Sequence, residues 1–134
     1  MAVIDASVFV AMLNPTEPGY AASVAWFQQE ARLKKVISAP VILMAEVAAA
    51  MSRGMGNTTL AHQVIQQLSR STSIQLYPIT QSLAEQAAVI AADHRIRGCD
   101  AVYVALAQQL GETLITLDRE QLQRGTAVIP TNQP

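Results

Sequence analysis

The sequence predicts an α/β fold, specifically an α/β/α sandwich in which helices cover both faces of a mostly parallel central sheet. Strand-like and helix-like segments alternate along the 134 residues, and the strand-like segments are apolar almost without interruption. Small aliphatic residues are abundant, whereas aromatic residues make up only 4% of the chain. Strands that are apolar on both faces need helices on both sides. Because a chain of this length buries one good core, we expect a single domain over residues 1–134.

The first half of the chain is expected to contain two strands and four helices. In order, these are a strand at 2–4, helices at 7–13 and 20–33, a strand at 36–39, and helices at 40–53 and 58–68. The pairs Asn14-Pro15 and Pro18-Gly19 mark the turn between the first two helices. Pro40 suits the first turn of its helix, where proline is tolerated, and Asn57 suits the N-cap of the next helix.

The second half is expected to contain three strands and three helices. In order, these are a strand at 74–79, helices at 80–96 and 100–110, a strand at 113–117, a short helix at 118–123 and a last strand at 126–129. Thr80 should cap the first of these helices, and Gly98 should separate it from the second. In parallel sheets, binding sites form beyond the carboxyl ends of the strands. Asp5 and Asp118 each follow a predicted strand, and so lie where a site is expected.

The composition argues against several classes of function. The net charge of −1 disfavours a protein that binds nucleic acid by charge alone, because such proteins carry a basic excess. The single cysteine, Cys99, rules out an intrachain disulfide and a multi-cysteine zinc site, and it suits a reducing, cytoplasmic setting. We expect its thiol to be buried and inert. The N-terminus lacks the basic start of a signal peptide, and no apolar run reaches the roughly 18 residues of a membrane span.

Four of the ten acidic residues stand in unusually apolar surroundings. Asp5 is the only charged residue in the first sixteen, Glu46 the only one from 36 to 52, and Asp100 the only one from 98 to 111. Asp118 directly follows the strand-like TLITL. An ionised carboxylate in an apolar setting is costly unless it is paired or bound to a metal.

A divalent cation would account for all four acids at once. The nearby cations are too few to pair with each acid, and carboxylates brought together repel one another and raise at least one pKa. Ligands that are all oxygen favour a hard ion, Mg²⁺ or Mn²⁺.

Each acid also has a simpler explanation. Asp5 and Asp100 could cap the helices that follow them, and Glu46 could form one buried salt bridge with an arginine. Asp118 with Gln121 resembles a capping box. These roles do not exclude metal binding, because a carboxylate at a helix start can also hold an ion.

Four segments around these acids carry a family resemblance. They are VIDASVFVAML, APVILMAEVAAAM, RGCDAVYVALAQQLG and TLITLDREQ. The first combines an apolar strand with Asp-x-Ser, the third contains Asp-Ala-x-x-x-Ala-x-Ala, and the last contains Thr-x-Asp. Over nearly its whole length the chain resembles the PIN-domain family, and most closely the VapC-type toxins of prokaryotic toxin–antitoxin pairs.

The resemblance implies a site, a reaction and partners. By position, the catalytic, metal-binding acids would be Asp5, Glu46, Asp100 and Asp118, with Ser7 and Thr116 as supporting hydroxyls. Local backbone capping is the alternative role for both hydroxyls. The implied protein is a magnesium- or manganese-dependent endoribonuclease, the toxin of a type II pair, with an RNA substrate, a cognate protein antitoxin and a homodimeric state. Where the family often has an aromatic residue after the last acid, this chain reads DREQLQRG.

Three other interpretations remain. A phosphotransfer receiver domain of similar fold would need an acid beside Asp5 and a late lysine, but the only lysines are Lys34 and Lys35. A phosphatase of the haloacid-dehalogenase type would need Asp-x-Asp at the first strand, where position 7 is serine. A non-catalytic PIN-like interaction module is the third alternative, and the presence of all four acids argues against it.

Overall fold

The computed structural model describes residues 1–134, and every predicted strand and helix but the last strand has a counterpart in it. The strands are β1 (Ala2–Ile4), β2 (Ile37–Pro40), β3 (Ile74–Tyr77), β4 (Thr113–Ile115) and β5 (Thr131–Asn132). The helices are α1 (Ala6–Leu13), α2 (Tyr20–Arg32), α3 (Ile42–Ala49), the π-helical η1 (Ala50–Gly54), α4 (Thr58–Arg70), α5 (Gln81–His94), α6 (Gly98–Leu110) and α7 (Arg119–Gly125). No helix combines the length and the apolar character needed to cross a bilayer.

The five strands form one fully parallel sheet in the order β3-β2-β1-β4-β5. β1 is central, with Val3 opposite Ser38 of β2 and Leu114 of β4. The chain first builds outward from β1 to β2 and β3, and then adds β4 and β5 on the other side. At such a switch point the connections leave the sheet in opposite directions, which opens a crevice at the carboxyl ends of the strands.

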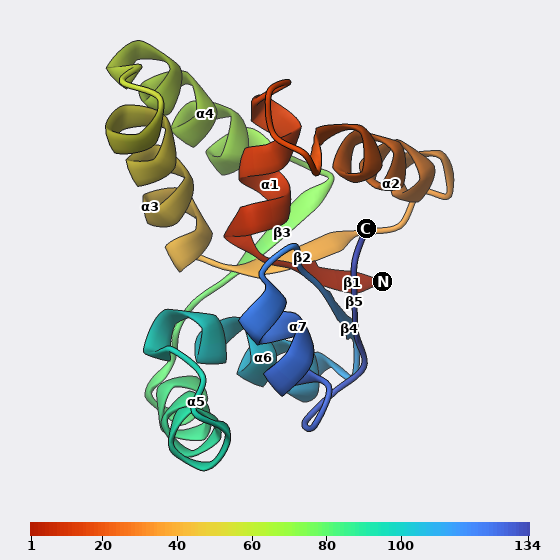
Figure 1. Ribbon diagram of the computed structural model, residues 1–134, viewed down its shortest axis with the longest axis vertical. Helices are drawn as coiled ribbons and strands as arrows, with labels where there is room; N and C mark the ends of the chain where they lie inside the picture. The colour runs from red at the N-terminus through yellow and green to blue at the C-terminus, as the bar shows by residue number, and fades with distance from the viewer.

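Helices cover both faces of the sheet, with α1 to α4 on one side and α5 to α7 on the other (Figure 1). This arrangement confirms the predicted α/β/α sandwich. The strands β1 and β2 are buried along their whole length, as their mainly apolar sequences favour, and Ser38 is the one polar residue among them. Fully buried side chains come from both layers, for example Val8 of α1, Leu43 of α3 and Val104 of α6.

Two predicted helix caps are confirmed by their hydrogen bonds. The side-chain oxygens of Asn57 and Thr80 accept from the backbone amides of Leu60 and Leu83, at 2.9 and 3.1 Å. Each cap satisfies an amide that the first helical turn leaves without a partner.

The helix predicted from Pro40 starts later and changes its winding. Pro40 is instead the last residue of β2, in register with Tyr77 of β3, and α3 begins at Ile42. The continuation of α3 is the π-helical η1, which the apolar pattern does not predict. Single π-helical turns often occur beside functional sites. Ala49 and Ala50, at this junction, line the cavity described below.

Two further boundaries were predicted wrongly. Gly98 is the first residue of α6, and the break before it begins at Arg95, whose φ of 55° is left-handed. The strand predicted at 126–129 is a series of turns, because the Val128 and Ile129 amides both bond back to the Gly125 carbonyl. The last strand therefore forms only at β5.

Candidate active site

A cavity of about 410 Å³ opens beyond the carboxyl ends of the central strands. Its polar lining consists of Asp5, Ser7, Glu46, Arg97, Asp100 and Asp118. The four acids singled out in the sequence therefore line one cavity, although they come from four separate parts of the chain. Asp5 lies at the start of α1, Glu46 on α3, Asp100 on α6 and Asp118 at the start of α7.

Asp5 is the most deeply buried of these acids, with 3% of its surface exposed. It caps α1, because its Oδ1 accepts from the Val8 amide at 3.3 Å. Ser7 Oγ donates to the same oxygen and Thr116 Oγ1 donates to Oδ2, both at 2.5 Å. Burial raises the pKa of Asp5 to about 6, the three hydrogen bonds oppose this rise, and the charge of Asp100 adds to it. The carboxylate is thus firmly oriented and costly to ionise.

Glu46 projects from α3 and is half-buried. Tyr103 Oη donates to Glu46 Oε2 at 2.5 Å, and the simpler salt bridge to an arginine does not form. Burial raises the pKa of Glu46, the Tyr103 hydrogen bond lowers it, and Asp100 raises it further. Tyr103 was not predicted from the sequence as part of the site. Its position three residues after Asp100, on the same side of α6, is the signal that could have identified it.

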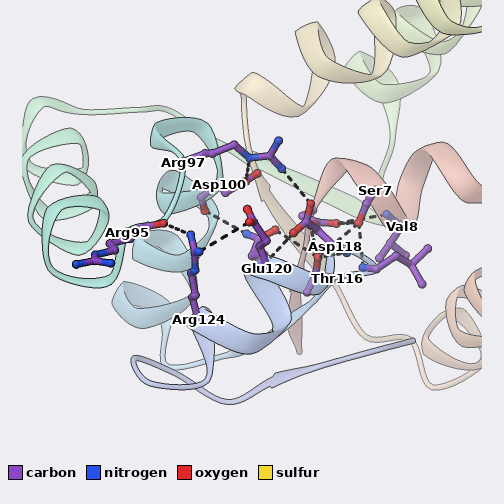
Figure 2. A network of polar contacts seen from close by, with 12 residues as sticks. Ser7, Val8, Arg95, Arg97, Asp100, Thr116, Asp118, Glu120 and Arg124 are labelled. Atoms are coloured by element: carbon purple, nitrogen blue, oxygen red, sulfur yellow. Dashed lines mark hydrogen bonds and ion pairs between the residues drawn. The ribbon is translucent and has the colours of Figure 1, made fainter.

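One arginine joins the remaining two acids (Figure 2). Arg97 Nε donates to Asp100 Oδ2 and Arg97 Nη2 donates to Asp118 Oδ2, each at 2.9 Å. Asp118 also caps α7, because its Oδ1 accepts from the Gln121 amide at 2.9 Å. Asp100 lies within the first turn of α6 and does not cap it. Burial raises the pKa of Asp100, and the contact with Arg97 counteracts that rise.

Polar contacts behind the acids tie their supporting elements together. The Leu117 amide donates to Ser7 Oγ at 2.9 Å, and the Asp118 amide donates to Thr116 Oγ1 at 3.0 Å. The side chain of Gln121, only 1% exposed, donates from Nε2 to the Asp100 carbonyl at 3.1 Å. The ends of β1 and β4 and the starts of α6 and α7 are therefore held in one arrangement. Gln121 was predicted only as a capping partner of Asp118, and a glutamine in a short polar helix gives no further signal.

The donor set suits a hard divalent cation. Four carboxylates and one arginine line the cavity, so four negative charges against one positive leave a formal charge of −3 when all are ionised. Oxygen-only ligands favour Mg²⁺ or Mn²⁺, and Asp5, Glu46, Asp100 and Asp118 are the residues that would hold the ion. No three acidic, histidine or cysteine side chains stand close enough to hold one in this structure, in which Arg97 engages two of the four acids.

The lone cysteine is not part of this site. Cys99 is exposed on the first turn of α6, so the expectation of a buried thiol was wrong. The apolar pattern around it reflects the next residues of α6, such as Ala101 and Val104, which face the core while Cys99 faces outward.

Comparison with known proteins adds a family and a set of similar folds. The sequence model described as PIN domain matches residues 2–126, and no curated protein matches the chain. VapC20 of Mycobacterium tuberculosis, described as a Sarcin-Ricin loop cleaving toxin, superimposes with a TM-score of 0.79 at 18% identity over 100% of both chains. FitAcB from Neisseria gonorrhoeae gives 0.70 at 19% identity, over 100% of this chain and 98% of the other. A toxin–antitoxin complex from Klebsiella pneumoniae gives a TM-score of 0.62 at 14% sequence identity, over 90% of each chain.

Proposed function

The chain belongs to the PIN-domain family, and from that premise we propose that it is a metal-dependent endoribonuclease acting on RNA phosphodiester bonds. The observation that carries the proposal is the convergence of four carboxylates on one cavity at the switch point of the sheet. Family membership supports nuclease activity. The likeness in fold to VapC20, described as a toxin that cleaves the Sarcin-Ricin loop, supports RNA as the substrate class. We take residues 1–134 as one PIN-like domain.

In the proposed reaction, Asp5, Glu46, Asp100 and Asp118 would hold Mg²⁺ or Mn²⁺. When bound, such a cation supplies Lewis acidity that makes water a better nucleophile and stabilises charge on phosphate oxygens. The chain's own contribution is orientation. Ser7 and Thr116 fix both oxygens of Asp5, as Tyr103 fixes one oxygen of Glu46. The expected products carry a 5′-phosphate and a 3′-hydroxyl, and no covalent enzyme intermediate is needed.

The biological role we propose is that of a cytoplasmic toxin in a type II toxin–antitoxin pair. The likeness in fold to VapC20, and to a chain of the Klebsiella pneumoniae toxin–antitoxin complex, supports this role. The cognate antitoxin would be a small protein that covers the acidic cavity and inserts a basic side chain into it. Such an insertion would be favourable because of the excess negative charge of the cavity. The toxin would act as a homodimer.

The decisive experiment is an RNA cleavage assay on purified protein with a matched pair of variants. Asp100→Asn should lose nearly all activity in Mg²⁺, because it removes one charged ligand from a site that has few. Asp93→Asn makes the same chemical change at an exposed position on α5 outside the cavity, and should retain activity. Circular dichroism would verify that both variants fold. Activity of Asp100→Asn within a few-fold of wild type would contradict the assignment of the site.

A further inference from the structure

Arg97 is the one cation lining the acidic cavity, and its contacts leave Asp118 with no unbonded oxygen. Asp118 Oδ2 accepts from Arg97, and Asp118 Oδ1 accepts from the Gln121 amide. At Asp100, the Arg97 contact occupies Oδ2. A cation approaching these two carboxylates would meet the positive guanidinium at a distance where like charges repel strongly. The ion pairs of Arg97 and the coordination of a metal by the same oxygens are therefore competing states.

The placement of Arg97 allows its side chain to leave Asp100 and Asp118 at a low cost in free energy. It is the N-cap residue of α6, and 67% of its side chain is exposed. Its side chain donates only to the two acids, while its backbone carbonyl accepts from the Ala101 amide of α6. Because the guanidinium is largely in solvent, although Asp100 and Asp118 are only 20% and 28% exposed, these ion pairs contribute less to stability than fully buried pairs would. By contrast, the Asp118 side chain is also bonded to the first turn of α7, and the backbone of Asp100 is held by the Gln121 side chain, so the arginine is the partner that can move.

From these contacts we propose that Arg97 is a positioning residue that competes with the divalent cation. In the metal-free protein it holds Asp100 and Asp118 and offsets part of their repulsion. Binding of the cation displaces it toward solvent at the edge of the cavity. This inference rests on the proposed function, because it requires a metal at these carboxylates, and it assigns to Arg97 the role of setting the metal affinity.

The inference can be tested by titrating Mn²⁺ into the full chain and following the free ion by electron paramagnetic resonance. Arg97→Gln should bind Mn²⁺ about fivefold more tightly than wild type, since two exposed ion pairs no longer compete. At about 0.5 kcal/mol each, these pairs add up to about 1 kcal/mol, which corresponds to that factor. The control is Arg119→Gln, which removes the same charge beside Asp118 from an exposed side chain that makes no ion pair. Its affinity should change less than twofold.

A second measurement needs no variant. In wild type, the nuclear magnetic resonance signal of the Arg97 Nε–H should shift on titration with Mg²⁺ as its bond to Asp100 breaks, and the shift should saturate with the metal.

An unmoved resonance at saturating Mg²⁺, or equal effects of Arg97→Gln and Arg119→Gln on the Mn²⁺ affinity, would overturn the proposed competition. If wild type binds Mn²⁺ as tightly as Arg97→Gln, only the role of Arg97 falls. If neither protein binds Mn²⁺, the metal site of the proposed function falls with it.

Discussion

The buried carboxyl of Asp5 should make the stability of the metal-free protein depend on pH. Its pKa is about 6 in the native state, against an ordinary value of 3.8. Because the native state binds this proton more tightly than the unfolded state, the contribution of Asp5 to stability is fully present below pH 3.8. It is lost as the pH rises through 6. A shift of about two units corresponds to about 3 kcal/mol over the whole titration, of which about 2 kcal/mol falls between pH 4 and pH 7.

Asp5→Asn removes this titration while keeping a side chain of similar shape. The amide oxygen can still accept from Val8, but the amide nitrogen cannot accept from a hydroxyl, so we expect a pH-independent cost of about 1 kcal/mol. Wild type loses about 2 kcal/mol of unfolding free energy between pH 4 and pH 7 as Asp5 ionises, and the variant does not. The variant should therefore be the more stable protein at pH 7.

Urea denaturation in EDTA, followed by circular dichroism at several pH values, would measure this difference. Asp93→Asn is the control, because it makes the same chemical change at an exposed side chain outside the cavity. If the unfolding free energies of wild type and Asp5→Asn changed in parallel with pH across this range, burial would not raise the pKa of Asp5, and the reasoning would be refuted. In millimolar Mn²⁺, wild type should be stabilised by RT ln(1 + [L]/Kd), and Asp5→Asn much less because it has lost a ligand.

Three further predictions concern the reaction and the partner. EDTA should abolish RNA cleavage, and Mg²⁺ or Mn²⁺ should restore it better than Ca²⁺, whose looser coordination positions water less well; cleavage that persists in EDTA would exclude the metal mechanism. Tyr103→Phe removes a hydrogen bond that lowers the Glu46 pKa, so the acidic limb of the pH–rate profile should move to higher pH. An unmoved limb would mean that Tyr103 only fills space. Expression of the chain should arrest growth, and co-expression of a small protein encoded by the neighbouring gene should relieve the arrest; absence of such a gene would weaken the toxin role but not the nuclease.

Most elements could be predicted because their cause is local. The strand at Ala2–Ile4 and the caps Asn57 and Thr80 follow from apolar runs and from the polar residue that precedes a helix. The wrong start of the third helix arose where a partner distant in sequence decided the outcome, whereas the strand predicted at 126–129 failed because of local turn bonds to Gly125. Pro40 joins β2 because β3 lies alongside it, although its own residue type is equally compatible with a helix start.

The features of the candidate site also fall into two groups, those that the local sequence indicates and those that depend on distant partners. An acid alone in an apolar segment is visible in the sequence, because an uncompensated charge there needs a reason. The spacing of Tyr103 from Asp100 places its side chain on the side of the site, but the local pattern does not indicate its partner, Glu46, 57 residues away. It likewise does not indicate that Arg97 meets Asp118, 21 residues away.

By itself, therefore, the sequence determined the α/β class and singled out four acids as candidate ligands, since hydrophobic periodicity and isolated charges are properties of neighbouring residues. The family was indicated by the resemblance of four motifs and is shown by the match over residues 2–126. The tertiary structure alone decided that these acids share one cavity, that burial raises the pKa of Asp5, and that Arg97 bridges two of the acids. The physical reason is that desolvation and ion pairing depend on distances across the switch point. Those distances exist only once β1 and β4 are paired and α6 and α7 are packed against them.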